Sequence, residues 1–132
     1  CEDERRKKRL TKIENHLWDK LSMARYHDQR KSQRARGVNF SRNEFLNWLK
    51  INYNGCCHYC GISLEEFQKK KSNLKFKLQA NKFGIDRKNS MLGYSIDNIA
   101  VSCSTCNIVK SFLFDDEEFK EIAKKYIRKL YD

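Results

Sequence analysis

Two Cys-x-x-Cys pairs are the feature of this 132-residue sequence that most constrains its fold. Cys57 and Cys60 form the first pair, Cys103 and Cys106 form the second, and 42 residues lie between the pairs. Two such pairs are typical of a tetrahedral zinc site, whereas disulfide-rich domains scatter their cysteines. We therefore predict one structural zinc site with four thiolate ligands and no open position, with Cys56 as an alternative ligand to Cys57.

The composition excludes two classes of protein. Mean hydropathy is −0.85, and no stretch approaches the roughly 18 consecutive apolar residues that a membrane-spanning helix needs. No apolar segment follows the charged N-terminus, so a secretory signal is not expected. Because thiols stay reduced inside cells, we expect an intracellular protein of the cytoplasm or nucleus. The sequence begins with Cys1 rather than Met, which favours a fragment or processed form of a longer chain.

Positive charge is concentrated in the first third of the chain. The formal net charge is +11, and seven basic residues but only one acidic residue lie between Lys20 and Arg42. This density favours a polyanionic partner, since each neutralised phosphate releases counterions. The alternative is a solvated helix face. The candidate nucleic-acid contacts in this stretch are Arg30, Lys31, Arg34, Arg36 and Arg42.

Apolar periodicity predicts helices over residues 5–30 and 41–54, a short helix after Ser63, and a last helix from Asp115. A further helix is expected to begin near Ser104 or Thr105. Strands are predicted over residues 74–78, 83–86 and 98–102. The expected apolar stripe of the last helix is Phe119, Ile122, Ala123, Tyr126, Ile127 and Leu130. The predicted layout is a basic helical arm, residues 1–54, followed by a zinc-stapled domain, residues 55–132.

A chain of motifs runs between and around the cysteine pairs: Ile85-Asp86-Arg87, Gly93-Tyr94, Asn98, Cys103-x-x-Cys106-Asn107 and Lys110. It resembles the HNH nucleases of the ββα-metal class, in the subgroup whose finger is held by four cysteines. The resemblance covers roughly residues 30–113, and the segment RARGVNFSRNEFLNWL also looks like the helical preface of phage-type HNH proteins. It implies an α+β fold: a zinc-stapled ββα-metal finger with an N-terminal helical arm and a C-terminal amphipathic helix.

The resemblance also implies roles for individual residues. Asp86 and Asn107 match the protein ligands of a catalytic Mg²⁺ or Mn²⁺, and oxygen ligands suit such a hard cation. Asn98 matches the middle asparagine, which would bond the backbone across the loop. Lys110 lies one helical turn after Asn107 and could contact a phosphate, the alternative being a solvated helix lysine.

Arg87 departs from the family pattern, because it stands where the general-base histidine is expected. A guanidinium titrates at roughly 12–14 and does not accept a proton near neutral pH. Three interpretations stay open. Tyr94 or His58 could be the base, although His58 lies inside the cysteine pair and favours a structural role there. Water bound to the metal could attack while Arg87 binds the phosphate. The module could also have lost cleavage and kept binding.

The resemblance thus implies a metal-dependent endonuclease that hydrolyses phosphodiester bonds in DNA, with RNA not excluded. A homodimer, or further domains of a longer chain, are alternatives for its assembly. One alternative function is a non-catalytic zinc-finger module that binds nucleic acid, for which Arg87 is the best support. Another is a zinc-stabilised protein-interaction domain, which explains neither the basic stretch nor Asp86.

Overall fold

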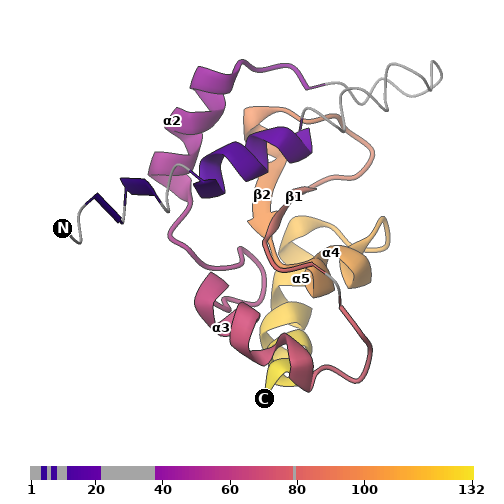
Figure 1. Cartoon of the computed structure of the whole chain (residues 1–132). Helices are drawn as coiled ribbons and strands as arrows, with labels where there is room; N and C mark the ends of the chain where they lie inside the picture. The colour runs from indigo at the N-terminus through magenta and orange to yellow at the C-terminus, as the bar shows by residue number, and fades with distance from the viewer. Residues whose placement is uncertain (1–3, 6, 9–11, 22–37, 79) are drawn as a thin grey trace.

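The computed structural model describes residues 4–5, 7–8, 12–21, 38–78 and 80–132, and helices surround a small two-stranded sheet (Figure 1). Residues 12–21 are helical, so the described part of the expected arm helix is confirmed there. The further elements, in chain order, are α2 (Arg42–Asn52), α3 (Leu64–Lys70), η1 (Lys71–Asn73), β1 (Gly84–Arg87), η2 (Ile96–Asn98), β2 (Ile99–Ser102), α4 (Ser104–Lys110) and α5 (Asp116–Ile122). The chain then continues from α5 through the π-helical η3 (Ala123–Ile127) and the 3₁₀-helical η4 (Arg128–Tyr131).

Local capping explains where the helices begin. The Ser41 hydroxyl accepts a hydrogen bond from the Glu44 N–H, and the Glu44 carboxylate accepts one from the Ser41 N–H. Asp115 and Glu118 make the same reciprocal pair at the start of α5. Such pairs satisfy backbone N–H groups that have no partner inside the helix. The helix starts predicted at these positions are therefore confirmed.

The sheet consists of β1 and β2, which run antiparallel with Asp86 opposite Ala100 and Arg87 opposite Ile99. The strands predicted over residues 83–86 and 98–102 are thus confirmed to within one residue at each end. The strand predicted over residues 74–78 is wrong, because the chain bends there and β1 pairs with β2 alone among the described strands. Without a neighbouring strand, alternation of apolar residues does not suffice to form one.

One hydrophobic core joins the described arm residues to the cysteine-containing domain. Leu17 and Leu21 of the first helix are buried in the same cluster as Phe45 and Leu49 of α2 and the cysteines. Trp18 packs on Phe45, with ring centroids 5.9 Å apart. Trp18 is partly buried and packs against this core. The division into two parts at residue 54 stays a prediction.

The last helix buries a different stripe from the one predicted. Phe119, Ala123, Ile127 and Tyr131 are buried, whereas Tyr126 is 56% exposed and Leu130 is exposed as well. The π-helical turn of η3 has more residues per turn than an α-helix, so steps of four residues stay on one face. Tyr131 consequently replaces Leu130 in the core.

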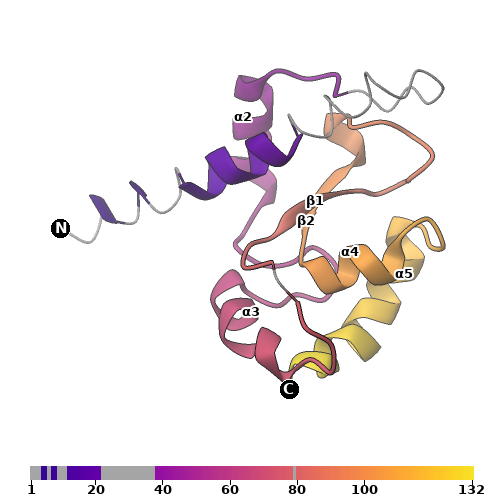
Figure 2. The same cartoon turned by 45° about the vertical axis from the view of Figure 1, so that its right-hand side comes forward.

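Two loops project on the same side of the molecule, as the turned view shows (Figure 2). One joins β1 to β2, and the other joins α4 to α5. None of the described helices is long and apolar enough to cross a membrane.

Candidate metal centre and active site

The four cysteines of the two pairs come together in one buried cluster. The sulfur atoms of Cys57, Cys60, Cys103 and Cys106 all lie within 4.8 Å of one another. Zinc–sulfur bonds of about 2.3 Å in a tetrahedron place sulfur atoms about 3.8 Å apart. The Cys60 and Cys103 sulfurs are 3.8 Å apart, so the donor set fits such an ion. The four-cysteine cluster predicted from the sequence is therefore confirmed, with Cys57 rather than Cys56 as its member.

Hydrogen bonds hold this cluster together and favour the thiolate form of Cys57. The Cys103 N–H donates to Cys57 Sγ at 3.3 Å, and the Tyr131 hydroxyl donates to Cys103 Sγ at 3.2 Å. Contacts with the other three thiols, first Cys103, lower the pKa of Cys57. Gly61, with φ of +82°, closes the first pair by donating its N–H to the Cys57 carbonyl. A side chain is disfavoured at that φ.

The first cysteine pair carries two aromatic side chains that reach the rest of the site. Tyr59 is buried, and its hydroxyl donates a hydrogen bond to Asp86 Oδ2. Burial and the neighbouring Asp86 carboxylate raise the pKa of Tyr59 well above its usual range, so the phenol stays a donor. His58 Nε2 lies 2.8 Å from Asp116 Oδ1, at the start of α5. The cluster thus connects directly to a candidate catalytic residue through Tyr59, which the sequence analysis missed.

Asp86 occupies the third position of β1 and is only 7% exposed. Burial raises the pKa of its carboxyl group, against the opposing effects of the Tyr59 hydroxyl and the Lys110 ammonium. Lys110 Nζ lies 3.3 Å from Asp86 Oδ2. Both contacts involve Oδ2, and Oδ1 takes part in neither. Oδ1 is therefore the atom that could bind a cation.

Asn107 approaches the face of β1 that carries Asp86. A side-chain carbon added at Gly84 would lie 3.5 Å from Asn107 Nδ2. Gly84 and Asp86 are two residues apart, so they lie on the same face of the strand. Asn107 directly follows the cysteine ligand candidate Cys106 on α4, and the cluster therefore controls where its amide emerges. A carboxylate and an amide side chain that approach the same face carry the kind of oxygen donors that fit Mg²⁺ or Mn²⁺.

The Asn98 side chain holds the β1–β2 loop through hydrogen bonds to its backbone. Its Nδ2 donates to the carbonyls of Asn89 and Gly93 at 3.0 and 2.9 Å, and its Oδ1 accepts from the Asn89 N–H at 2.8 Å. These are hydrogen bonds to backbone across the loop, as the resemblance to HNH nucleases implied. Asn98 is 6% exposed, and its side chain is engaged in holding the loop.

Arg87 lies beside the loop that Asn98 holds. One of its guanidinium nitrogens donates to the Leu92 carbonyl at 3.3 Å, and the group sits 5.3 Å from the centre of the Tyr94 ring. The Tyr94 ring thus supports the guanidinium by a cation–π contact. The other N–H groups of the Arg87 guanidinium are the donors that could bind a phosphate.

Of the residues predicted to contact nucleic acid, the structure describes only Arg42 and Lys110. Arg30, Lys31, Arg34 and Arg36 lie outside the described residues. Arg42 is exposed at the start of α2 and hydrogen-bonds Asn15. Both interpretations of Lys110, a phosphate contact and a solvated helix lysine, are wrong, because its side chain is entirely buried. Its ammonium is held by Asp86 and by the Arg87 carbonyl at 2.9 Å, so it faces neither solvent nor a phosphate.

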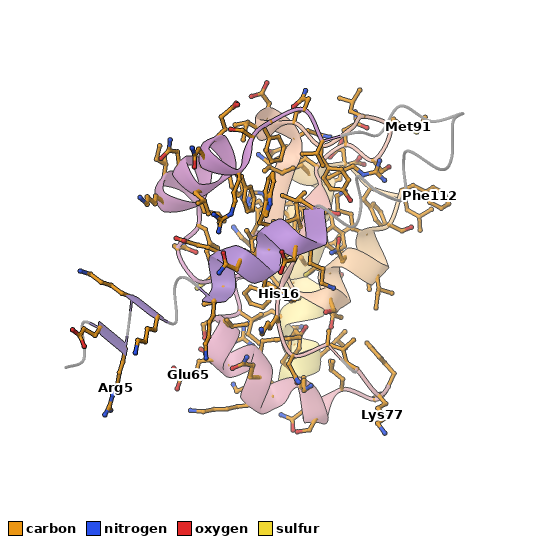
Figure 3. The ribbon with its side chains drawn as sticks, turned by 45° about the horizontal axis from the view of Figure 1, so that its top comes forward. Arg5, His16, Glu65, Lys77, Met91 and Phe112 are labelled. Atoms are coloured by element: carbon orange, nitrogen blue, oxygen red, sulfur yellow. The ribbon has the colours of Figure 1, made fainter. Side chains whose placement is uncertain are left out.

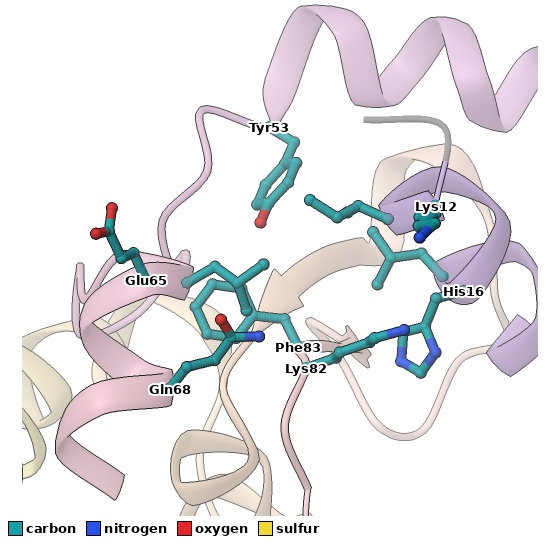
Figure 4. Close-up of a pocket in the computed structure, with 10 residues that line it drawn as sticks. Lys12, His16, Tyr53, Glu65, Gln68, Lys82 and Phe83 are labelled. Carbon is teal, nitrogen blue, oxygen red and sulfur yellow. The ribbon is translucent and has the colours of Figure 1, made fainter. Parts of the chain in front are cut away.

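Figure 3 draws the described side chains on the ribbon and labels His16, which belongs to a second feature of the surface. A separate cleft of about 560 Å³ opens between residues 12–21 and α3, with His16, Tyr53 and Lys82 at its walls (Figure 4). None of the residues lining it is a predicted site residue. Burial and the coulombic effects of Lys82 and Lys20 lower the pKa of His16, and its buried Nε2 has no hydrogen-bond partner among the described residues. The cleft therefore lies apart from the candidate active site.

Comparison with solved structures finds a similar chain. The rare-cutting HNH restriction endonuclease PacI superposes with a TM-score of 0.66 and 28% sequence identity, over 88% of this chain and 77% of that chain. A mechanism of DNA perturbation has been described for PacI. No family model matches the chain, and no curated protein matches it.

Proposed function

This chain has the α+β fold of the HNH endonucleases, and we propose that it is a metal-dependent endonuclease that hydrolyses phosphodiester bonds in DNA. Its similarity to an HNH restriction endonuclease supports a nuclease function at the level of the family. The net charge of +11 suits a polyanionic substrate.

A single observation carries the proposal beyond the fold. The buried carboxylate of Asp86 lies on the face of β1 that Asn107 approaches, and Asp86 Oδ1 is outside the contacts with Tyr59 and Lys110. We assign Asp86 and Asn107 as the protein ligands of Mg²⁺ or Mn²⁺. Two protein ligands leave coordination positions for water and phosphate oxygens. The cation would polarise the scissile phosphate and stabilise the leaving oxygen.

Arg87 is proposed to bind the phosphate rather than to accept a proton. A guanidinium offers hydrogen-bond donors and no acceptor, and the Leu92 carbonyl and the Tyr94 ring fix the direction of this one. Of the two candidate bases, His58 uses Nε2 in its contact with Asp116, which supports a structural role for that histidine. Asn98 acts through the loop: by bonding Asn89 and Gly93 it holds the segment that carries the Arg87 contacts.

The four-cysteine cluster is proposed to bind zinc and to have a structural role. All four ligands are buried sulfurs, so no position is open to substrate. Zinc there would fix Tyr59 against Asp86 and set the position of Asn107 after Cys106.

Cleavage of supercoiled plasmid in Mg²⁺ or Mn²⁺ tests the function. The Asp86→Asn variant keeps the shape of the side chain and removes its charge, and Asp97→Asn, at an exposed carboxylate before β2, is the matched control. We expect cleavage by the parent and by Asp97→Asn, and a loss of at least about 100-fold in Asp86→Asn, the lower range for catalytic groups. Zinc content and circular dichroism establish that each variant is folded.

The second candidate function is a non-catalytic module that binds nucleic acid, and Arg87 at the general-base position favours it. Folded, zinc-loaded parent protein that binds DNA without cutting it would replace the nuclease proposal by this one. A matching assay on duplex RNA tests whether DNA is the preferred substrate.

A further inference from the structure

Large apolar side chains stand exposed at the tips of the two loops that project on one side of the molecule. Met91 and Leu92 belong to the β1–β2 loop, and Phe112 and Leu113 belong to the α4–α5 loop. Met91 is 80% exposed, Phe112 is 76% exposed, and Leu92 and Leu113 are also exposed. We call these four residues the apolar rim. Figure 3 labels Met91 and Phe112, and both point toward the same edge of the molecule in that view.

The apolar rim borders the candidate catalytic residues on two sides. The Leu92 carbonyl accepts a hydrogen bond from Arg87, and the Leu113 N–H donates to the Lys110 carbonyl at 3.0 Å. Lys110 in turn contacts Asp86. These contacts tie both tips to residues of the candidate site, Arg87 and Lys110.

The backbone at Ser111 adopts a strained conformation where the α4–α5 loop turns outward. Ser111 ends α4 with φ of 44° and ψ of −127°, a conformation that a residue with a Cβ rarely adopts. Its N–H still donates to the Asn107 carbonyl at 3.1 Å, so the turn is locked to the residue that faces β1. Strain of this kind clusters at functional sites. Here it sends Phe112 and Leu113 into solvent instead of back onto the core.

The charges nearby favour DNA over a second copy of this chain as the partner. Arg87 and Lys88 are the ionisable groups at the start of the β1–β2 loop, and both are partly exposed. The acids that follow the rim are already engaged, Asp115 in the α5 cap and Asp116 with His58. The proposed function also requires DNA to approach Arg87, whose guanidinium donates to the Leu92 carbonyl of the rim.

We propose that the apolar rim inserts between stacked base pairs of the bound duplex beside the phosphate that is cut. This inference rests on the proposed function and adds a mode of DNA engagement to it. Apolar side chains that enter base steps unstack them and distort the duplex, and the distortion allows more contact with the protein. Phe112 and Leu113 are the main wedge, since the locked Ser111 turn holds them out, and Met91 and Leu92 support the opposite side.

A sequence-independent measurement of DNA unwinding tests the proposal. The full chain carrying Asp86→Asn, which leaves plasmid uncut, is bound to relaxed plasmid, treated with a type I topoisomerase and removed. A wedge that unstacks base pairs changes the linking number in proportion to the protein bound. We expect this change to fall at least about fivefold when Phe112→Ser and Leu113→Ser are added. The matched control adds Ile51→Ser, at an 83% exposed residue of α2, and should keep the change.

Filter binding on the same plasmid, and sedimentation without DNA, make each outcome decisive. Equal unwinding by the rim variant and the control, or binding without unwinding, overturns the proposal. Self-association that disappears only in the rim variant assigns the rim to a second copy and also overturns it. If the parent chain cuts plasmid but no unwinding is seen, only this inference fails. If the parent neither binds nor cuts DNA, the proposed function fails with it.

Discussion

The ammonium of Lys110 lies 3.3 Å from the carboxylate of Asp86, and both side chains are almost entirely buried. The same ammonium donates to the Arg87 carbonyl at 2.9 Å. One lysine therefore orients the candidate metal ligand and holds the backbone of the residue at the general-base position. Lys110 acts through these neighbours, which makes it a positioning residue in the proposed mechanism.

Replacing Lys110 with Met should destabilise the fold and shift the pH dependence of cleavage. Removing one partner of a buried ion pair costs about 3–5 kcal/mol, because the other charge is left uncompensated. The Lys110 ammonium lowers the pKa of Asp86, so removing that ammonium raises the pKa of Asp86 further. The acid limb of the pH–rate profile should therefore move to higher pH.

Chemical denaturation and a pH–rate profile measure these two effects. Lys77→Met, at an exposed lysine, is the matched control and should leave both unchanged. A Lys110→Met protein with the stability and the pH profile of the parent would show that the pair does not hold Asp86.

Cys103→Ser should abolish zinc binding and cooperative folding. Cys103 is wholly buried in the cluster, and structural zinc supplies folding free energy that a small core lacks. Metal analysis and thermal unfolding measure the effect, and we expect close to one zinc per chain in the parent. Cys56→Ser is the control, because Cys56 is half-buried and outside the cluster. A loss of zinc in Cys56→Ser would reverse the assignment of Cys57.

Replacing Arg30, Arg34 and Arg36 with Ala should flatten the salt dependence of DNA binding. Each lost phosphate contact lowers the slope of log K against log salt by about 0.9, so three contacts correspond to about 2.7. The control replaces three dispersed exposed lysines, Lys69, Lys77 and Lys124, and makes the same change in net charge. Equal changes in both proteins would assign the effect to net charge and not to the arm.

The stability of the protein should fall as the pH is lowered through the range where histidine titrates, and His16 should contribute to that fall. Its pKa is lowered in the folded state by burial and by Lys82 and Lys20. The unfolded chain therefore binds the proton more tightly, so the His16 contribution is intact above the ordinary histidine pKa of about 6.5 and is lost as the pH falls through the folded pKa.

Denaturation curves between pH 7.5 and pH 5, in the parent and in His16→Gln, separate this contribution from those of other groups. We expect a shallower decline in the variant, because glutamine does not titrate. An identical pH dependence in the two proteins would remove His16 as a cause.

Much of the scaffold could be predicted because its signals are local. The two cysteine pairs have the spacing of a metal site, and the four sulfurs do converge. Ser41 with Glu44, and Asp115 with its following acids, mark helix starts through hydrogen bonds within four residues. The strand predicted over residues 74–78 failed, since alternation says nothing about whether a neighbouring strand exists.

The sequence by itself determined the residue types at the candidate site, the metal cluster and the excess of positive charge. Only the tertiary structure decided that Lys110 turns inward to Asp86, that Tyr59 bridges the cysteine cluster to the same carboxylate, and that Asn107 approaches β1 at Gly84. The physical reason is that burial and pairing depend on which faces of distant segments meet. Spacing along a chain fixes which side of a helix or strand a residue occupies, and packing decides what it finds there.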